Sequence, residues 1–155
     1  MLLSAFTACH VILSLIGIAT GVVVLYGWTT ARSFERWITI FLITTIATSV
    51  TGFLFPFHKF MPSHALGILS LLVLAVALAV RYKQQWRRTF LVTSTLALFL
   101  NFFVLIAQLF QKVPALNAFA PTQSEPPFLA TELLALILFA AAGTLAVTKR
   151  SREAQ

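Results

Sequence analysis

The side chains of this chain that could do chemistry are few, and they are mainly imidazole, amide and carboxylate groups. There are three histidines, and the four acidic residues are all glutamate. Imidazole and carboxylate groups bind zinc, copper and iron, a histidine pair can ligate haem, and buried polar groups recognise small molecules. The predicted ligand-binding residues are His10, His58, His64, Asn101, Gln108, Lys112, Glu125 and Glu132.

The same inventory argues against most enzyme classes. The chain has no Asp, no Gly-x-Ser-x-Gly motif and no phosphate-binding loop. Nucleophilic hydrolysis and the usual magnesium-dependent chemistries therefore have no support in the sequence. With a single cysteine there is neither an intramolecular disulfide nor a Cys-x-x-Cys motif. We expect a binding protein rather than an enzyme.

Long apolar segments must hold these side chains in place, because the chain is too apolar for a soluble domain. Its 155 residues are 59% hydrophobic and 10% charged, and the mean hydropathy is +0.94. Soluble domains are about 25% charged, and a helix of about 20 apolar residues crosses a bilayer. We predict an all-α integral membrane bundle, a single domain over residues 1–155, with five transmembrane helices at about residues 5–27, 37–55, 64–81, 89–111 and 128–148.

The positive charges lie mostly at one end of these segments. Of the eleven lysines and arginines, all except Lys59 and Lys112 fall at or beyond the end of the first, third or fifth segment. Because cytoplasmic loops carry the excess of positive charge, we predict an outside N-terminus and a cytoplasmic C-terminus. This topology accounts for the net charge of +7, so we expect contact with anionic membrane lipids and no nucleic-acid partner.

Small and polar residues recur at helical spacing and are expected to face other helices. On the first helix this set is His10, Ser14, Gly17 and Gly21, and on the second it is Thr44, Thr45, Thr48, Thr51 and Gly52. Glycine lets a second helix approach closely, and hydroxyl groups are costly in lipid, so we expect these two faces to pack together. Most of these positions are interpreted as packing contacts.

The fourth and fifth predicted helices also carry polar side chains. Ser94, Asn101 and Gln108 recur every seven residues and are predicted to point inward. Glu132 lies one or two turns inside the fifth helix, and an ionisable residue within a membrane span is a functional hypothesis by default. His10 meets the same criterion on the first helix. Together with the topology, these positions predict a site that faces the periplasm.

The two loops on the predicted outer side are rich in proline. Residues 55–63 contain two prolines and three phenylalanines, a composition that favours a fixed turn at the membrane interface. The loop at residues 111–128 between the fourth and fifth helices contains four prolines. Its other residues are too apolar for a solvated coil, so we expect a short helical or re-entrant piece that covers the bundle mouth.

Four segments of the chain resemble a known family. They are FPF at residues 55–57, PSHALG at residues 62–67, KVPAL at residues 112–116 and APTQSEPPF at residues 120–128. These segments are similar to those of an uncharacterised family of small bacterial multi-helix inner-membrane proteins. The resemblance implies a multi-pass location in the bacterial inner membrane and carries no activity with it.

Three functional hypotheses follow from these residues. The first is binding or transport of a small ligand at a periplasm-facing polar pocket, with the protein acting alone or as an accessory subunit. The second is a redox role in which the outer-face histidines bind haem b or a quinone. The third is a metal site of histidine and carboxylate ligands, with His10, His58 and His64 as candidates. We also expect association into a homo-oligomer or a larger membrane complex.

Overall fold

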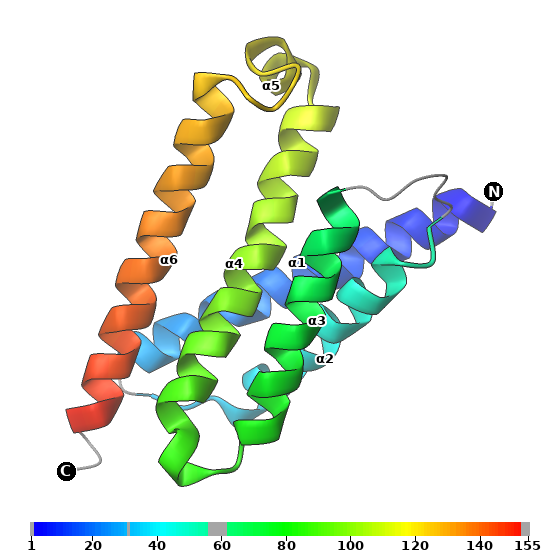
Figure 1. Ribbon diagram of the computed structural model, residues 1–155. Helices are drawn as coiled ribbons and strands as arrows, with labels where there is room; N and C mark the ends of the chain where they lie inside the picture. Colours follow the sequence, from blue (N-terminus) through cyan, green and yellow to red (C-terminus); the bar gives the residue numbers. More distant parts are fainter. Residues whose placement is uncertain (1, 31, 56–61, 153–155) are drawn as a thin grey trace.

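The computed structural model describes residues 2–30, 32–55 and 62–152, and all regular structure in these ranges is helical. The long helices are α1 (Leu2–Thr29), α2 (Glu35–Gly52), α3 (Pro62–Val80), α4 (Arg87–Lys112) and α6 (Pro126–Arg152), and the short ones are the 3-10 helix η1 (Gln84–Trp86) and α5 (Pro114–Phe119) (Figure 1). The predicted all-α class is confirmed. The predicted ligand-binding residue His58 and the positively charged Lys59 lie outside the described residues.

Each predicted apolar segment corresponds to one long helix, with ends that differ by a few residues. All five helices begin two or three residues before the predicted segments, whereas α2 ends at Gly52 and α3 at Val80, short of the predicted residues 55 and 81. Two of the early starts include charged residues, because a charge ends a hydropathy segment without ending a helix. Glu35 and Arg36 thus form the first turn of α2, and Arg87 begins α4. Helix boundaries are the part of such a prediction that periodicity determines least.

Three helices of the described chain are long and apolar enough to cross a membrane. These stretches are Leu3–Thr29, Gln84–Lys112 and Pro126–Lys149. The stretch His64–Val80 of α3 is apolar but shorter. Helix α2 has 18 residues, and two of them are the charged Glu35 and Arg36. The structure is therefore a membrane-type helical bundle with three candidate spans in its described part.

The interior is divided into two hydrophobic clusters. We call the larger one the basic-end core, because it lies where α1 ends, α2 begins, α4 begins and α6 ends. It comprises Val24, Leu25, Trp28, Ile38, Phe41, Leu42, Leu74, Ala77, Phe90, Leu91, Ala97, Leu98 and Ala146. We call the smaller one the α5 core, which comprises Ile106, Phe110, Ala120, Phe128 and Ala135, with Leu116 of α5 packed against it.

Helix α1 packs mainly on α2, and it crosses behind α4 and α6 at a slant (Figure 1). The predicted pairing of the polar faces of α1 and α2 is confirmed. A methyl group on Gly17 would lie 3.0 Å from Thr45 Oγ1, and one on Gly21 would lie 2.9 Å from the Phe41 ring. His10 Nδ1 and Thr51 Oγ1 are 2.8 Å apart in a hydrogen bond. The glycine stripe is therefore occupied within the chain.

An arginine joins α3 to α2 at the basic end. The Arg81 guanidinium donates a hydrogen bond of 2.7 Å to Thr39 Oγ1 and lies 3.8 Å from a carboxylate oxygen of Glu35. Its side chain is only 10% exposed. The positive segments that follow α1 and α3 consequently lie at the same end of the bundle, as the charge distribution requires.

Candidate functional site

The structure divides the predicted site residues between two regions. His10 and His64 pack against residues at the end of α2. Lys112, Glu125 and Glu132 belong to the end of α4, the loop after α5 and the start of α6. Asn101 lies in the middle of α4, and its side chain is hydrogen-bonded to Ser14 of α1. The contacts of these residues thus fall in different parts of the described bundle, and the common ligand pocket stays a prediction.

The two described histidines make packing contacts. The His10 ring forms its hydrogen bond with the Thr51 hydroxyl and packs edge-on against the Phe55 ring, with 5.1 Å between the ring centroids. His64 is buried, and its ring lies 6.1 Å from that of Phe53. Within the described ranges, no group of three or more His, Cys, Asp or Glu side chains could hold a metal ion. The haem or quinone hypothesis stays a prediction.

The predicted inward line on α4 is correct for two of its three members. Ser94 and Asn101 are buried, and Asn101 Oδ1 accepts a 2.9 Å hydrogen bond from Ser14 Oγ of α1. Gln108 is exposed, so its predicted inward position is wrong. The reason is the slant of α1, which meets α4 near Asn101 and then diverges from it (Figure 1). The same face of α4 is therefore uncovered one heptad later.

Glu132 is the most unusual of the predicted residues. It shares one face of α6 with Phe128 and Ala135, which are four residues before it and three residues after it. Both neighbours belong to the α5 core, so this face brings the carboxyl group into apolar surroundings. The Glu132 side chain is 8% exposed. Both carboxyl oxygens are buried, and neither has a hydrogen-bond partner among the described residues.

A carboxyl group in this position has a high free energy unless something binds to it. Burying a polar group without a hydrogen bond costs about 1–3 kcal/mol in proteins, and an unpaired carboxylate costs far more. Buried polar atoms in folded proteins nearly always have partners, so an exception calls for an explanation. The arrangement at Glu132 therefore favours binding of a proton or of another hydrogen-bond donor.

Helix α5 covers the end of the α4–α6 pair where Glu132 lies (Figure 1). Pro114 occupies its first turn, where proline is well tolerated because its missing N–H would be unpaired anyway. Two amide side chains hold this segment on α4. Asn117 donates to the Phe110 carbonyl at 3.2 Å, and Gln123 donates to the Ala107 carbonyl at 2.6 Å. The predicted short helix in this loop is confirmed, and it lies over the α4–α6 end of the bundle.

The loop between α5 and α6 is organised around Glu125. Its Oε1 accepts hydrogen bonds from the Thr122 backbone N–H at 3.1 Å and the Thr122 hydroxyl at 2.8 Å. Its Oε2 accepts from the Ser124 N–H at 3.1 Å. Partial desolvation would raise the pKa of Glu125, but these hydrogen bonds together lower it below its ordinary value. Glu125 thus acts as a structural acceptor within the loop.

The loop should accordingly lose protection in acid. Because the folded-state pKa of Glu125 is lowered, its contribution is fully present above the unfolded value of about 4.3 and is lost as the pH falls through the lower folded value. We expect the amide protection factors of Thr122 and Ser124 to fall over this range. Hydrogen exchange measured by mass spectrometry tests this, with Glu125→Gln as the control. A loop whose pH response is the same in both proteins would contradict the assignment.

Several residues of the site were not singled out by the sequence. The α5 core, to which the Glu132 neighbours Phe128 and Ala135 belong, also includes Ile106 and Phe110 of α4. Their spacing carried a signal, because Ile106 and Phe110 are four residues apart, as are Phe128 and Glu132. The role of Gln123 had no such signal. Its backbone is left-handed with φ of 59°, a conformation in which glycine or asparagine is more usual.

Comparison with known proteins assigns no function to this site. The resemblance to small bacterial inner-membrane proteins rests on its four sequence segments and stays a prediction. No protein-family model, curated protein or solved structure matches this chain.

Proposed function

We propose that this chain is a multi-pass protein of the bacterial inner membrane whose five long helices all span, with the N-terminus in the periplasm. The uneven distribution of lysine and arginine supports this orientation. The contact of Arg81 with Glu35 and Thr39 also supports it, since it joins two of the basic segments at one end. At the C-terminus, a fused reporter that works only in the cytoplasm should be active, and one that works only in the periplasm should be inactive. The opposite result would overturn the orientation.

The proposed function is binding of a small cationic ligand at the periplasmic end of the α4–α6 pair. One observation carries this proposal, namely that both oxygens of the buried Glu132 lack a partner among the described residues. An ammonium group would supply charge-assisted hydrogen bonds to these oxygens, which are about twice as strong as neutral ones. Binding would therefore satisfy the group that the protein alone leaves unsatisfied.

The surroundings of Glu132 indicate what the rest of the ligand would be. The Phe110 and Phe128 rings pack edge-on, with centroids 5.5 Å apart, and Ile106 completes an apolar wall. Small-molecule sites typically combine an apolar lining with a few polar groups that fix orientation. The ligand class that matches is an amine attached to a compact apolar or aromatic body.

Helix α5 would control access to this site. It contributes Leu116 to the packing over the α5 core, and it is held on α4 by the two amide hydrogen bonds from Asn117 and Gln123. Breaking two such bonds costs only about 1–3 kcal/mol, since a typical hydrogen bond contributes about 0.5–1.5 kcal/mol net. A ligand could therefore enter by displacing α5 while α4 and α6 stay in place.

Benzylamine is a suitable probe, with benzyl alcohol as a neutral molecule of the same shape. At a benzylamine concentration one hundred times its Kd, binding should stabilise the purified protein by about 2.7 kcal/mol, measured as a rise in melting temperature. Benzyl alcohol should have a much smaller effect because it cannot form an ion pair. The variant Glu132→Gln keeps the side-chain size and should lose the response to benzylamine.

The control variant is Glu125→Gln, which removes the other carboxylate of the same region. It should respond to benzylamine as the unmodified protein does, because Glu125 is already engaged by Thr122 and Ser124. Equal stabilisation by the amine and the alcohol would refute the proposal. So would an undiminished benzylamine response in folded Glu132→Gln protein, with folding checked by circular dichroism.

A further inference from the structure

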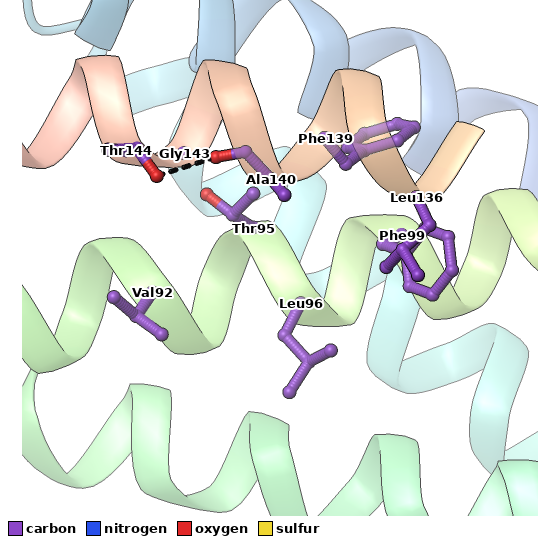
Figure 2. Close-up of a pocket in the computed structure, with 9 residues that line it drawn as sticks. All are labelled: Val92, Thr95, Leu96, Phe99, Leu136, Phe139, Ala140, Gly143 and Thr144. Carbon is purple, nitrogen blue, oxygen red and sulfur yellow. Dashed lines mark hydrogen bonds between the residues drawn. The ribbon is translucent and has the colours of Figure 1, made fainter. Parts of the chain in front are cut away.

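An open groove of about 280 Å³ runs between α4 and α6. Figure 2 shows its lining, in which Thr95 and Phe99 of α4 extend toward α6, whereas Leu96 lies on the side of α4 away from α6 in this view. The residues from α4 are Val92, Thr95, Leu96 and Phe99, and those from α6 are Leu136, Phe139, Ala140, Gly143 and Thr144. This groove lies nearer the basic end of the bundle than Glu132 does, so it is a separate feature from the proposed amine site.

The groove offers an occupant almost only apolar surface. Two of its lining residues carry hydroxyl groups, but both hydroxyls are already used within their own helices. Thr95 donates to the Leu91 carbonyl at 2.8 Å, and Thr144 donates to the Ala140 carbonyl at 2.8 Å, the bond drawn in Figure 2. A polar ligand would therefore find no free hydrogen-bond donor on these two side chains.

Small residues on α6 give the groove its depth. Gly143 lies so close to α4 that a methyl group on it would be 3.1 Å from Thr95 Cγ2, which is tighter than an ordinary contact. Ala140 lines the groove one turn before it. The Phe99 and Phe139 rings, which also line the groove, have centroids 5.9 Å apart.

The outside of the bundle at this position is the side that faces lipid. Val92 is 53% exposed and Leu136 is 46% exposed. Only 17% of the most apolar window of α6 is buried within the protein, compared with 50% for the corresponding window of α4. Both helices are candidate membrane spans, so hydrocarbon chains of the bilayer would surround these surfaces.

A positive charge lies in line with the groove at its basic end. Arg88 precedes Val92, Thr95 and Phe99 by four, seven and eleven residues, which places these residues on one face of α4. At about 1.5 Å of rise per residue, Arg88 is about 6 Å along the helix from the first lining residue.

We propose that this groove binds an anionic phospholipid, with one acyl chain between α4 and α6 and the phosphate headgroup at Arg88. The volume supports a single chain segment, because sites for whole drug-sized ligands measure about 300–1,000 Å³. The apolar lining matches an acyl chain, and the arginine in line with it matches a phosphate. This proposal does not depend on Glu132 or on which side of the membrane the basic end faces.

Native mass spectrometry of the full-length protein in mixed micelles tests the proposal. The micelles contain equimolar phosphatidylglycerol and phosphatidylcholine with identical acyl chains. One Lys or Arg near a membrane surface contributes about 1 kcal/mol toward an anionic lipid, which is about fivefold in affinity. We expect phosphatidylglycerol adducts to predominate by about that factor and Arg88→Gln to remove the preference. Lys83→Gln makes the same change in net charge at an exposed position outside α4 and α6, and this variant should keep the preference for phosphatidylglycerol.

The acyl-chain part has its own matched pair of variants. Ala140→Phe would fill the groove from an exposed position and should lower the adducts of both lipids severalfold. Ala141→Phe places the same ring on the neighbouring exposed residue of α6, which does not line the groove, and should bind as the unmodified protein does. Three results would each overturn the proposal. They are equal amounts of adduct for the two lipids, an equal loss of the phosphatidylglycerol preference in Arg88→Gln and Lys83→Gln, and unchanged lipid binding in Ala140→Phe.

Discussion

Replacing Glu132 with methionine is expected to stabilise the protein by about 1–3 kcal/mol, the usual cost of a buried unsatisfied polar group. Methionine has a similar length and no polar atom that needs a partner, and it adapts to irregular apolar spaces. Its side chain would extend the α5 core, to which Phe128 and Ala135 on the same helix face already belong. The measurement is reversible unfolding of the purified protein in mixed micelles of mild detergent and dodecyl sulfate.

The same variant should lose its response to benzylamine. A substitution that stabilises the fold while removing ligand binding is characteristic of functional sites, because binding groups are retained at the expense of stability. Glu125→Met is the matched comparison and should destabilise the loop, since it removes a carboxylate that accepts hydrogen bonds from Thr122 and Ser124. If Glu132→Met lowers stability as Glu125→Met does, Glu132 has a structural partner and the proposed function fails.

Replacing Gly21 with alanine is expected to destabilise the bundle by about 1–3 kcal/mol, as overpacking of a core usually does. The added methyl group would lie 2.5 Å from Leu98 Cδ1 and 2.9 Å from the Phe41 ring. Both neighbouring side chains are 1% exposed and belong to the basic-end core, so a shift of either would disturb its packed neighbours. Relief of the clash requires a shift of these side chains or of helix α1. The same unfolding measurement detects the loss.

Gly52→Ala is the control for this substitution. Its added methyl group would have His10 Cε1 as its nearest neighbour at 3.8 Å, which is an ordinary van der Waals contact. Removing a glycine from a helix gains up to about 1 kcal/mol, because the unfolded chain loses conformational freedom. We therefore expect a neutral or slightly stabilising effect. Equal effects of the two substitutions would show that the close approach at Gly21 is not important for stability.

The pairing of α1 with α2 could be predicted because it depends on local spacing. Ser14 and Gly17 face the same direction on any helix, and the hydroxyl-rich face of α2 is the natural partner for such a stripe. Glu132 could be identified for a similar reason, since an acidic residue inside an apolar segment needs an explanation wherever the segment packs. The short helix α5 was indicated by prolines on either side of apolar residues.

Features that depend on the distance and angle between helices could not be predicted in this way. Gln108 was expected inside because it shares a face with Asn101, but the angle at which α1 crosses α4 leaves it exposed. The groove between α4 and α6 arises from the contact of Gly143 with Thr95, which brings together residues 48 positions apart in the chain. Periodicity identifies the faces of a helix, whereas the crossing angle depends on every side chain along both helices.

The division of the interior into two clusters has a consequence for local unfolding. The basic-end core contains residues of all five long helices, whereas the α5 core contains residues only of α4, α6 and the segment after α5. Proteins open in cooperative units whose free energies depend on the contacts that each unit must break. We expect the region of α5 to be such a unit, whose opening leaves the basic-end core intact. Hydrogen exchange at the Glu132 end should therefore be governed by a smaller free energy than unfolding of the whole bundle.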